Sequence, residues 1–168
     1  VVPVNTSRGV REYLEKTGVK VNIIRVGYTF IQRALKKPEI NLGAEISGHL
    51  YFKDFFGIDS GLRALLKLSA IVAEAKQPLS GLVSKFETYV NSGEINFEVK
   101  DKRKVLAEVK KKYKDAKIST LDGVTVEYPD WWFNVRPSNT EPLIRVVMEA
   151  KTKNLLETEL RELKKIIK

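Results

Sequence analysis

The stretch from Arg136 to Val146 reads RPSNTEPLIRV and gathers hydrogen-bond donors on a short turn. Arg136 and Arg145 bracket a Ser-Asn-Thr triplet and two prolines. Guanidinium groups bind phosphate oxygens through paired, charge-assisted hydrogen bonds. Small polar residues in a turn also leave backbone N–H groups that point outward. The pattern therefore suits the binding of a tetrahedral phosphate dianion.

An ordinary turn would contain the same residue types, because proline, serine and asparagine are common in turns of every function. In that case Arg136 would form a surface ion pair with Glu141, and Arg145 with Glu149. Such pairs contribute only about 0–1 kcal/mol to stability. The residues of this turn alone leave both interpretations open.

A second group of polar residues lies in the stretch GAEISGHLYF, residues 43–52. Glu45, Ser47 and His49 alternate there between glycines. A carboxylate accepts hydrogen bonds from two neighbouring sugar hydroxyls, and serine and histidine donate or accept further ones. Taken singly, a loop glutamate is usually a solvated charge, and a lone histidine is usually a packed or capping residue. The combination is more specific and indicates a sugar-binding loop.

The composition limits the class of protein. The chain has 168 residues, of which 43% are hydrophobic, and it contains no cysteine. The absence of cysteine excludes disulfides and thiolate metal sites and favours the cytoplasm. No apolar run approaches the roughly 20 residues that span a bilayer, and the first residues do not resemble a secretory leader. We therefore expect a cytoplasmic globular protein without a membrane partner.

The net charge of +9 raises the possibility of nucleic-acid binding. Residues 1–93 contain 13 Lys and Arg against 8 Asp and Glu, and residues 94–168 contain 17 against 13. The net charges of the two halves are thus +5 and +4, so the positive charge is not concentrated in either half. The densest basic cluster, Lys110–Lys114, closes a predicted helix, where cations stabilise the helix dipole. We favour a solvated helix end, and a nucleic-acid binder that uses this cluster with Tyr113 is the alternative.

Strand and helix signals alternate along residues 1–92. The β-prone runs that we expect as strands cover residues 1–4, 19–26 and 40–42. Helices are expected between them, one beginning near Ser7 and one capped by Thr29. A long helix follows Asp59 or Ser60, either of which suits an N-cap. Its expected buried face consists of Leu62, Leu65, Leu66, Ser69, Val72 and Ala73. The alternation predicts a three-layer α/β unit.

Residues 93–168 have a different pattern, which reads β-α-β-β-β-β-α. Ile95, Phe97 and Val99 alternate strictly with polar residues, as in a half-buried strand. Asp101 suits the N-cap of the next helix, and Asp122-Gly123 predicts a two-residue hairpin turn. The last helix has leucines and an isoleucine at helical spacing. We expect an α+β domain with an antiparallel sheet of four to five strands, covered by two helices.

Both polar stretches resemble motifs of one known family. Gly43-Ala44-Glu45-Ile46-Ser47-Gly48-His49 resembles the sugar-recognition loop of the α-D-phosphohexomutases, and Arg136-Pro137-Ser138-Asn139-Thr140-Glu141-Pro142 resembles their phosphate-binding loop. The similarity is greatest to the phosphomannomutase/phosphoglucomutase branch. It implies an enzyme of four domains. Residues 1–92 would be most of domain 3, incomplete at its N-terminal side, and residues 93–168 would be all of domain 4.

The resemblance also implies roles for single residues. Glu45, Ser47 and His49 would bind the sugar hydroxyls, and His49 would assist proton transfer. The residues implied to bind the phosphate that is not transferred are Arg136, Ser138, Asn139, Thr140 and Arg145. Asn5, Arg8 and Tyr28 fall where relatives carry further site residues. Asn5 and Tyr28 depart from the basic residues that are often found there, so the sugar stays open among mannose, glucose and glucosamine.

The implied parent enzyme is an isomerase, an intramolecular phosphotransferase of carbohydrate metabolism. It would interconvert hexose 1-phosphate and hexose 6-phosphate through a phosphoserine, with hexose 1,6-bisphosphate as activator and Mg²⁺ as cofactor. The chain lacks the family's phosphoserine and Asp-Gly-Asp-x-Asp-Arg motifs, and it shows no carboxylate cluster suited to Mg²⁺. We therefore expect no metal site in this chain, missing N-terminal domains as partners, and no mutase activity of the chain alone. A stand-alone phosphosugar-binding module is the alternative.

Overall fold

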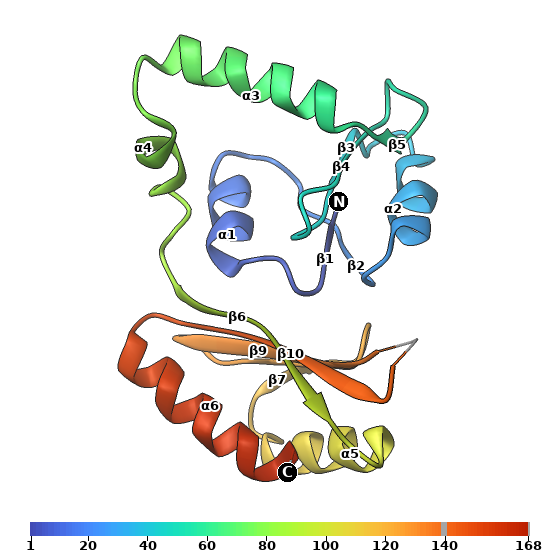
Figure 1. Ribbon diagram of the computed structural model, residues 1–168, viewed down its shortest axis with the longest axis vertical. Coiled ribbons are helices and arrows are strands. Elements are labelled where there is room, and N and C mark those ends of the chain that lie inside the picture. The colour runs from blue at the N-terminus through green and yellow to red at the C-terminus, as the bar shows by residue number, and fades with distance from the viewer. Residues whose placement is uncertain (139–140, 168) are drawn as a thin grey trace. The chain divides into compact units, whose positions relative to one another are not determined.

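The computed structural model describes residues 1–138 and 141–167. The chain divides into two units, Val1–Thr88 and Tyr89–Lys168, and each is described separately (Figure 1). The first unit alternates short strands with helices. The second contains an antiparallel sheet and two helices. The structure thus confirms the predicted order, an α/β unit followed by an α+β domain.

The first unit contains two small sheets that the N-terminal residue joins. β1 (Val2–Pro3) pairs in parallel with β2 (Ile23–Ile24), and α1 (Arg8–Lys16) connects them. β3 (Leu42–Ala44), β4 (Leu50–Phe52) and β5 (Ile58–Asp59) form an antiparallel sheet in that order. The amino group of Val1 donates to the carbonyl of Leu42, and the N–H of Ala44 donates to the carbonyl of Val1. The end of β1 therefore lies beside β3, which carries the start of the GAEISGH stretch.

A small core holds α2 (Tyr28–Leu35) against these strands. Its buried residues are Ile31, Ala34, Leu35, Ile40 and Tyr51. The predicted cap Thr29 is wrong, because the helix begins at Tyr28 and Gly27 occupies the N-cap position with a φ of 132°. The strand predicted over residues 19–26 is reduced to two residues, and Ile23 is 41% exposed. It is thus not the buried strand that its β-branched residues suggested.

The long helix α3 (Gly61–Ala75) begins where the sequence predicts. Ser60 is its N-cap, and its Oγ accepts a hydrogen bond from the N–H of Arg63 at 3.3 Å. The predicted buried face is wrong, since no residue of α3 is buried. Leu62, Leu65 and Leu66 are 71%, 59% and 63% exposed, and Ser69, Val72 and Ala73 are not buried either. Periodicity predicts an apolar face, but it does not say whether the same chain supplies the cover. α4 (Leu79–Val83) follows.

The second unit is built on one five-stranded antiparallel sheet. The sheet order is β6-β10-β9-β8-β7, so that β10 lies between the first strand and its hairpin partner β9. Helices α5 and α6 cover one face (Figure 1). The elements are β6 (Val90–Glu98), α5 (Lys102–Lys112), β7 (Lys117–Ser119), β8 (Val124–Glu127), β9 (Trp131–Pro137), β10 (Leu143–Ala150) and α6 (Lys153–Ile167).

Alternation along the strands separates an apolar face from a more polar one, although Trp132 and Val147 on the second face are also buried. The apolar residues pack against α5 and α6 and form the core of this unit. That core includes Val124, Val126, Phe133, Val135, Ile144, Val146 and Met148 from the strands and Val105, Val109, Leu156 and Leu163 from the helices. Residues at the intervening positions, among them Arg136 and Arg145, lie on the other face. The core thus fixes which face carries the candidate phosphate-binding side chains.

Turns and caps of the second unit follow local chemistry. Asp101 caps α5 as predicted, because its Oδ1 accepts a hydrogen bond from the N–H of Lys104 at 3.0 Å. The predicted hairpin is present, but its turn is longer than two residues, since Ser119 pairs with Thr125. Gly123 adopts a φ of 69°, which suits glycine. The carbonyl of Asp122 accepts a hydrogen bond from Asn134 of β9, which ties the longer turn to the sheet.

Candidate functional site

The GAEISGH stretch forms the tight connection between β3 and β4. Ala44 and Leu50 are the last paired residues, and residues 45–49 make the turn. The N–H of Glu45 donates to the carbonyl of His49, and the N–H of Gly48 donates to the carbonyl of Glu45, both at 3.0 Å. Gly48 has a φ of 90°, a conformation that favours glycine. We call residues 45–49 the sugar loop.

The structure brings the three predicted side chains of the sugar loop together. Ser47 Oγ lies 2.9 Å from His49 Nδ1, and this nitrogen lies 3.8 Å from Oε2 of Glu45. The side chain of His49 is 52% exposed and that of Glu45 is 13% exposed. The loop thus presents a hydroxyl and an imidazole to solvent beside a largely covered carboxylate. These are groups that bind sugar hydroxyls.

Tyr51 is a residue of this site that sequence reasoning missed. Its hydroxyl donates to Oε2 of Glu45 at 2.7 Å, and its ring is 2% exposed. Burial, followed by the hydrogen bond to Glu45, raises the pKa of the Tyr51 phenol, to which nearby Tyr28 also contributes. Tyr51 therefore stays protonated and holds the carboxylate. The sequence contained a signal for this role, because Tyr51 follows His49 by two residues and side chains two apart in an extended chain point to the same side.

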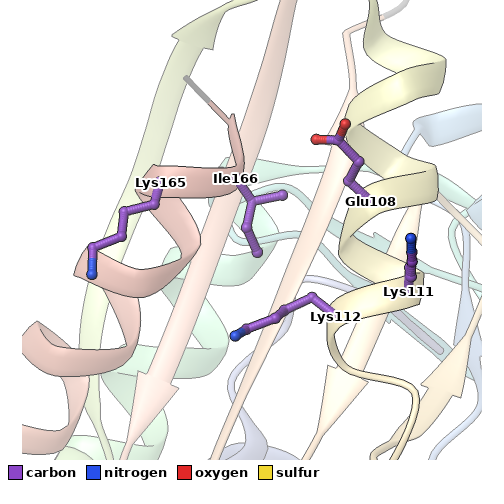
Figure 2. Close-up of a pocket in the computed structure, with 5 residues that line it drawn as sticks. All are labelled: Glu108, Lys111, Lys112, Lys165 and Ile166. Carbon is purple, nitrogen blue, oxygen red and sulfur yellow. The ribbon is translucent and has the colours of Figure 1, made fainter.

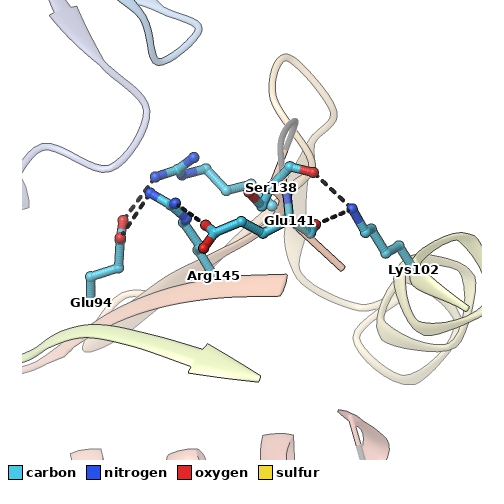
Figure 3. Close-up of polar contacts among 6 residues, drawn as sticks. Glu94, Lys102, Ser138, Glu141 and Arg145 are labelled. Carbon is cyan, nitrogen blue, oxygen red and sulfur yellow. Dashed lines mark hydrogen bonds and ion pairs between the residues drawn. The ribbon is translucent and has the colours of Figure 1, made fainter. Parts of the chain in front are cut away.

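The second candidate stretch connects β9 to β10 (Figure 3). The N–H of Ser138 donates to the carbonyl of Leu143 at 2.9 Å, and Ser138 Oγ accepts from the N–H of Glu141 at 3.2 Å. Lys102, the first residue of α5, donates through Nζ to the carbonyls of Ser138 and Glu141 at 2.8 and 2.7 Å. We call residues 136–142 the phosphate loop. Lys102 was not predicted from the sequence.

Arg136 and Arg145 are brought together, because they face each other across β9 and β10. Glu94 of β6 contacts both. Its Oε2 lies 2.8 Å from Nη2 of Arg136, and its Oε1 lies 3.4 Å from Nη1 of Arg145. The second terminal nitrogen of Arg145 lies 2.9 Å from Oε2 of Glu141 (Figure 3). Two adjacent guanidiniums thus lie at one rim of the sheet, and guanidiniums can donate paired, charge-assisted hydrogen bonds to an anion.

The ion pairs differ from those that the ordinary-turn interpretation assigned. Arg136 pairs with Glu94 and not with Glu141, and Arg145 pairs with Glu94 and Glu141 and not with Glu149. Glu149 instead accepts hydrogen bonds from Trp132 Nε1 at 2.8 Å and from Asn91 Nδ2 at 2.9 Å. Both arginines are thus drawn to one end of the sheet, next to the phosphate loop.

The remaining predicted site residues have varied positions. Asn139 and Thr140 lie outside the described residues. Asn5 follows β1 and is 2% exposed, and its Oδ1 accepts no hydrogen bond from the described part of the chain. Arg8 begins α1, and Tyr28 begins α2 with 56% exposure. Tyr28 contributes to the raised pKa of the Tyr51 phenol, which agrees with a position in the neighbourhood of the sugar loop.

A further hollow of about 500 Å³ lies between α5 and α6 (Figure 2). Its lining consists of Glu108, Lys111, Lys112, Lys165 and Ile166. Lys110, Lys111 and Lys112 occupy the last turn of α5, where cations favour the helix dipole. Lys165 is already paired with Glu162 at 2.6 Å. These positions agree with a solvated helix end.

Within residues 1–138 and 141–167, no helix has the length and apolar character needed to cross a membrane. In the same residues, no three His, Asp or Glu side chains gather in a way that would hold a metal ion. The described part of this chain therefore offers the sugar loop and the phosphate loop as its candidate sites.

Comparison with known proteins assigns both units. Residues 1–89 match the family described as phosphoglucomutase/phosphomannomutase, alpha/beta/alpha domain III, and residues 94–166 match its C-terminal domain. The chain is 36% identical to a phosphomannomutase of Methanocaldococcus jannaschii over 167 residues, which is 99% of this chain and 37% of that protein. It is 36% identical to a phosphomannomutase of Vibrio cholerae, with 94% and 35% covered.

Solved structures show the same fold. A phosphoglucomutase/phosphomannomutase family protein of Burkholderia thailandensis superposes with a TM-score of 0.84 at 27% identity, over 98% of this chain and 36% of that one. An N-acetylphosphoglucosamine mutase of Aspergillus fumigatus, at 12% identity, shares the fold with a TM-score of 0.75, over 100% of this chain and 41% of that one. The chain spans little more than a third of the relatives that it matches. It belongs to the phosphoglucomutase/phosphomannomutase family, of which it contains domain III and the C-terminal domain.

Proposed function

We propose that this chain is the C-terminal part of a phosphohexomutase that interconverts hexose 1-phosphate and hexose 6-phosphate. The whole enzyme would transfer the phosphoryl group through a phosphoserine and a bisphosphorylated sugar. The observation that carries the proposal is the pair formed by Arg136 and Arg145, which face each other across β9 and β10 and flank the Ser-Asn-Thr triplet in the sequence. In this proposal the chain recognises the substrate, and other domains of the whole enzyme bind and transfer the reacting phosphoryl group.

The phosphate loop would bind the phosphate that is not being transferred. Arg136 and Arg145 would donate charge-assisted hydrogen bonds to its oxygens, and Ser138 with Asn139 and Thr140 would supply further donors. The two phosphates of the bisphosphorylated sugar must exchange roles during the reaction. Binding energy gained at the non-reacting phosphate positions the other end of the sugar for transfer.

The sugar loop would bind the hydroxyls of the hexose. Tyr51 fixes one oxygen of Glu45, so the carboxylate is held in one orientation before the sugar arrives. Such preorganisation reduces the entropy that binding costs. Ser47 and His49 would donate or accept further hydrogen bonds, and His49 would assist proton transfer at the reacting hydroxyl. Asn5, Arg8 and Tyr28 are proposed to complete the surroundings of the sugar.

Mg²⁺ is proposed to act elsewhere in the whole enzyme. The described residues of this chain do not fit the ion, because no group of three carboxylate or imidazole side chains gathers among them. A related structure of the Aspergillus fumigatus mutase is a complex with GlcNAc-6P and magnesium. We propose that the metal and the phosphoserine belong to domains that this chain does not contain, with hexose 1,6-bisphosphate as the activator.

The surface of α3 supports a need for further domains. Its leucines and an isoleucine lie around most of the helix, and three charged residues, Arg63, Lys67 and Glu74, share one narrow stripe. A helix that is apolar on nearly all sides is normally buried. Leu62, Leu66 and Ile71 are nevertheless 71%, 63% and 54% exposed. We propose that the remaining phosphohexomutase domains cover this helix. Because this chain contains no cysteine, we also propose that the enzyme is cytoplasmic.

Calorimetric titration of the 168-residue chain tests the proposed function. Mannose 1-phosphate and glucose 1-phosphate should bind more tightly than inorganic phosphate, and the unphosphorylated sugars should bind least. A coupled assay should detect no interconversion of hexose phosphates by the chain alone. Equal affinity for hexose phosphate and inorganic phosphate would show that the sugar loop is not a recognition site. Turnover by the purified chain would show that the assignment of the catalytic groups is wrong.

The Tyr51→Phe variant tests the sugar loop separately. It removes the hydrogen bond to Glu45 and keeps the buried ring, so a loss of about 0.5–1.5 kcal/mol in hexose phosphate binding is expected, roughly two- to tenfold. Binding of inorganic phosphate should not change. Calorimetry with both ligands measures the two affinities. A Tyr13→Phe variant, altered in α1, is the control and should bind both ligands like the wild type.

A further inference from the structure

Arg136 and Arg145 are already paired with protein carboxylates. Glu94 accepts from Arg136 at 2.8 Å and from Arg145 at 3.4 Å, and Glu141 accepts from Arg145 at 2.9 Å (Figure 3). Two guanidiniums and two carboxylates carry no net charge together. Lys102, whose ammonium donates to the carbonyls of Ser138 and Glu141, adds one positive charge beside the cluster. A phosphate dianion that joined the cluster unchanged would still meet two carboxylates, so withdrawal of one carboxylate strengthens its binding.

The position of Glu94 fits a permanent role. It lies in β6, whose backbone is paired with β10 along most of its length. Each of its two oxygens contacts a different arginine, so one side chain holds both guanidiniums. Like charges that face each other across two strands repel, as Arg136 and Arg145 would without a shared counter-ion. Glu94 thus offsets the repulsion and orients both donors.

The position of Glu141 fits a temporary role. Its side chain is 50% exposed, compared with 27% for Glu94, and among the described residues its carboxylate pairs with Arg145 and not with Arg136. Its backbone is held independently, since its N–H donates to Ser138 Oγ and its carbonyl accepts from Lys102. The side chain can therefore turn away from Arg145 while these two backbone hydrogen bonds of Glu141 stay in place. Exposed ion pairs of this kind contribute little, about 0–1 kcal/mol.

We propose that Glu94 is the positioning residue of the arginine pair and that Glu141 is the carboxylate exchanged for an incoming phosphate. The inference rests on the proposed function, because it concerns the same phosphate loop. In the ligand-free chain Glu141 neutralises Arg145. When phosphate binds, the side chain of Glu141 leaves Arg145, and Glu94 keeps both guanidiniums side by side.

Opposite effects of two isosteric substitutions test the proposal. Binding of inorganic phosphate to the 168-residue chain is measured by calorimetry in a chloride buffer. Glu141→Gln should bind phosphate roughly two- to fivefold more tightly than the wild type, because an exposed competing pair is lost. Glu94→Gln should bind it about five- to tenfold more weakly, because the charged hydrogen bonds that orient the arginines are lost.

Glu98→Gln is the matched control. Glu98 lies on the same strand and the same face as Glu94, and the described structure gives it no hydrogen bond or ion pair with either arginine. Its substitution removes the same charge and should change the affinity less than twofold, since its effect is long-range and screened. The side-chain nitrogen signals of Arg136 in NMR spectra should broaden in Glu94→Gln alone, a change that loss of fold stability would not produce.

The results distinguish a failure of the proposed carboxylate exchange from a failure of the proposed function. If the wild type binds phosphate and both glutamine variants shift the affinity in the same direction, the exchange is wrong while the proposed function stands. The same holds if Glu94→Gln behaves like Glu98→Gln and the Arg136 signals stay sharp. If neither the wild type nor any variant binds inorganic phosphate or hexose phosphate, the proposed function is wrong and the exchange falls with it.

Discussion

Replacement of Arg136 by alanine is expected to weaken phosphate binding by at least tenfold. A hydrogen bond to a charged group contributes about 1.5–3 kcal/mol, which corresponds to roughly ten- to 150-fold in affinity. The Arg136 side chain is only 12% exposed, so water screens it little. Arg136→Lys should also lose affinity, because an ammonium cannot donate in the planar, paired geometry of a guanidinium. Calorimetry with inorganic phosphate and with mannose 1-phosphate measures both losses.

Arg161→Ala provides the control for this charge change. Arg161 lies on α6, which packs against the apolar face of the sheet, whereas Arg136 alternates with buried Val135 and lies on the other face. The control removes one positive charge from the same unit and should retain nearly the full affinity. Equal affinities of the Arg136 and Arg161 variants would mean that the phosphate loop attracts anions only through net charge.

Gly123→Ala is expected to cause the largest loss of stability in the second unit. A Cβ at this position would lie 2.1 Å from the carbonyl oxygen of Val135 and 2.6 Å from Cα of Arg136. These atoms belong to the backbone of β9 and cannot rotate away. Overpacking of this kind costs about 1–3 kcal/mol, and the left-handed conformation adds about 1–2 kcal/mol for a residue with a Cβ. Urea unfolding measures the total.

Gly93→Ala separates the two contributions. Gly93 has a φ of 68°, close to the 69° of Gly123, but an added Cβ would meet no atom within 4 Å. Its substitution should lower the free energy of unfolding by the conformational cost alone, about 1–2 kcal/mol. The difference in free energy of unfolding between the two variants measures the cost of the clash with the backbone at Val135 and Arg136. If both variants lose the same free energy of unfolding, the close approach of Gly123 to β9 does not contribute to the loss of stability.

Local chemistry made much of the second unit predictable. Alternation in residues 94–99 and the DG turn led to an antiparallel sheet, and Asp101 was recognised as a cap because its carboxylate can accept a nearby backbone N–H. Ser60 of the first unit was found in the same way. These features depend on residues a few positions apart, and a sequence pattern records such relations directly.

The features that could not be predicted depend on distant partners. Glu94 and Lys102 reach this site through contacts with residues 36 to 51 positions away in the sequence, and no local pattern encodes such distant contacts. The apolar residues of α3 were recognised, but none of them is buried, because periodicity alone does not identify what an apolar face packs against. The β-branched run at residues 19–26 likewise forms only the two-residue strand β2.

Simple geometry explains the wrong ion-pair assignment. Arg145 and Glu149 both lie on β10, where four residues span about 13 Å at a rise of about 3.3 Å per residue, too far for an ion pair. Glu141 is also four residues from Arg145, but the loop between β9 and β10 turns it back to within 2.9 Å. Once both arginines were assigned to the end of a hairpin, the strand geometry alone excluded the Glu149 partner.

An NMR titration of the ¹⁵N-labelled chain tests most directly the claim that two separate loops recognise two parts of one ligand. Mannose 1-phosphate should shift the backbone amide signals of Glu45–His49 and also those of Ser138, Glu141 and Leu143. Inorganic phosphate should shift only the second set. A titration in which mannose 1-phosphate leaves the Glu45–His49 signals unchanged would contradict the account, because the sugar would then be recognised elsewhere or not at all.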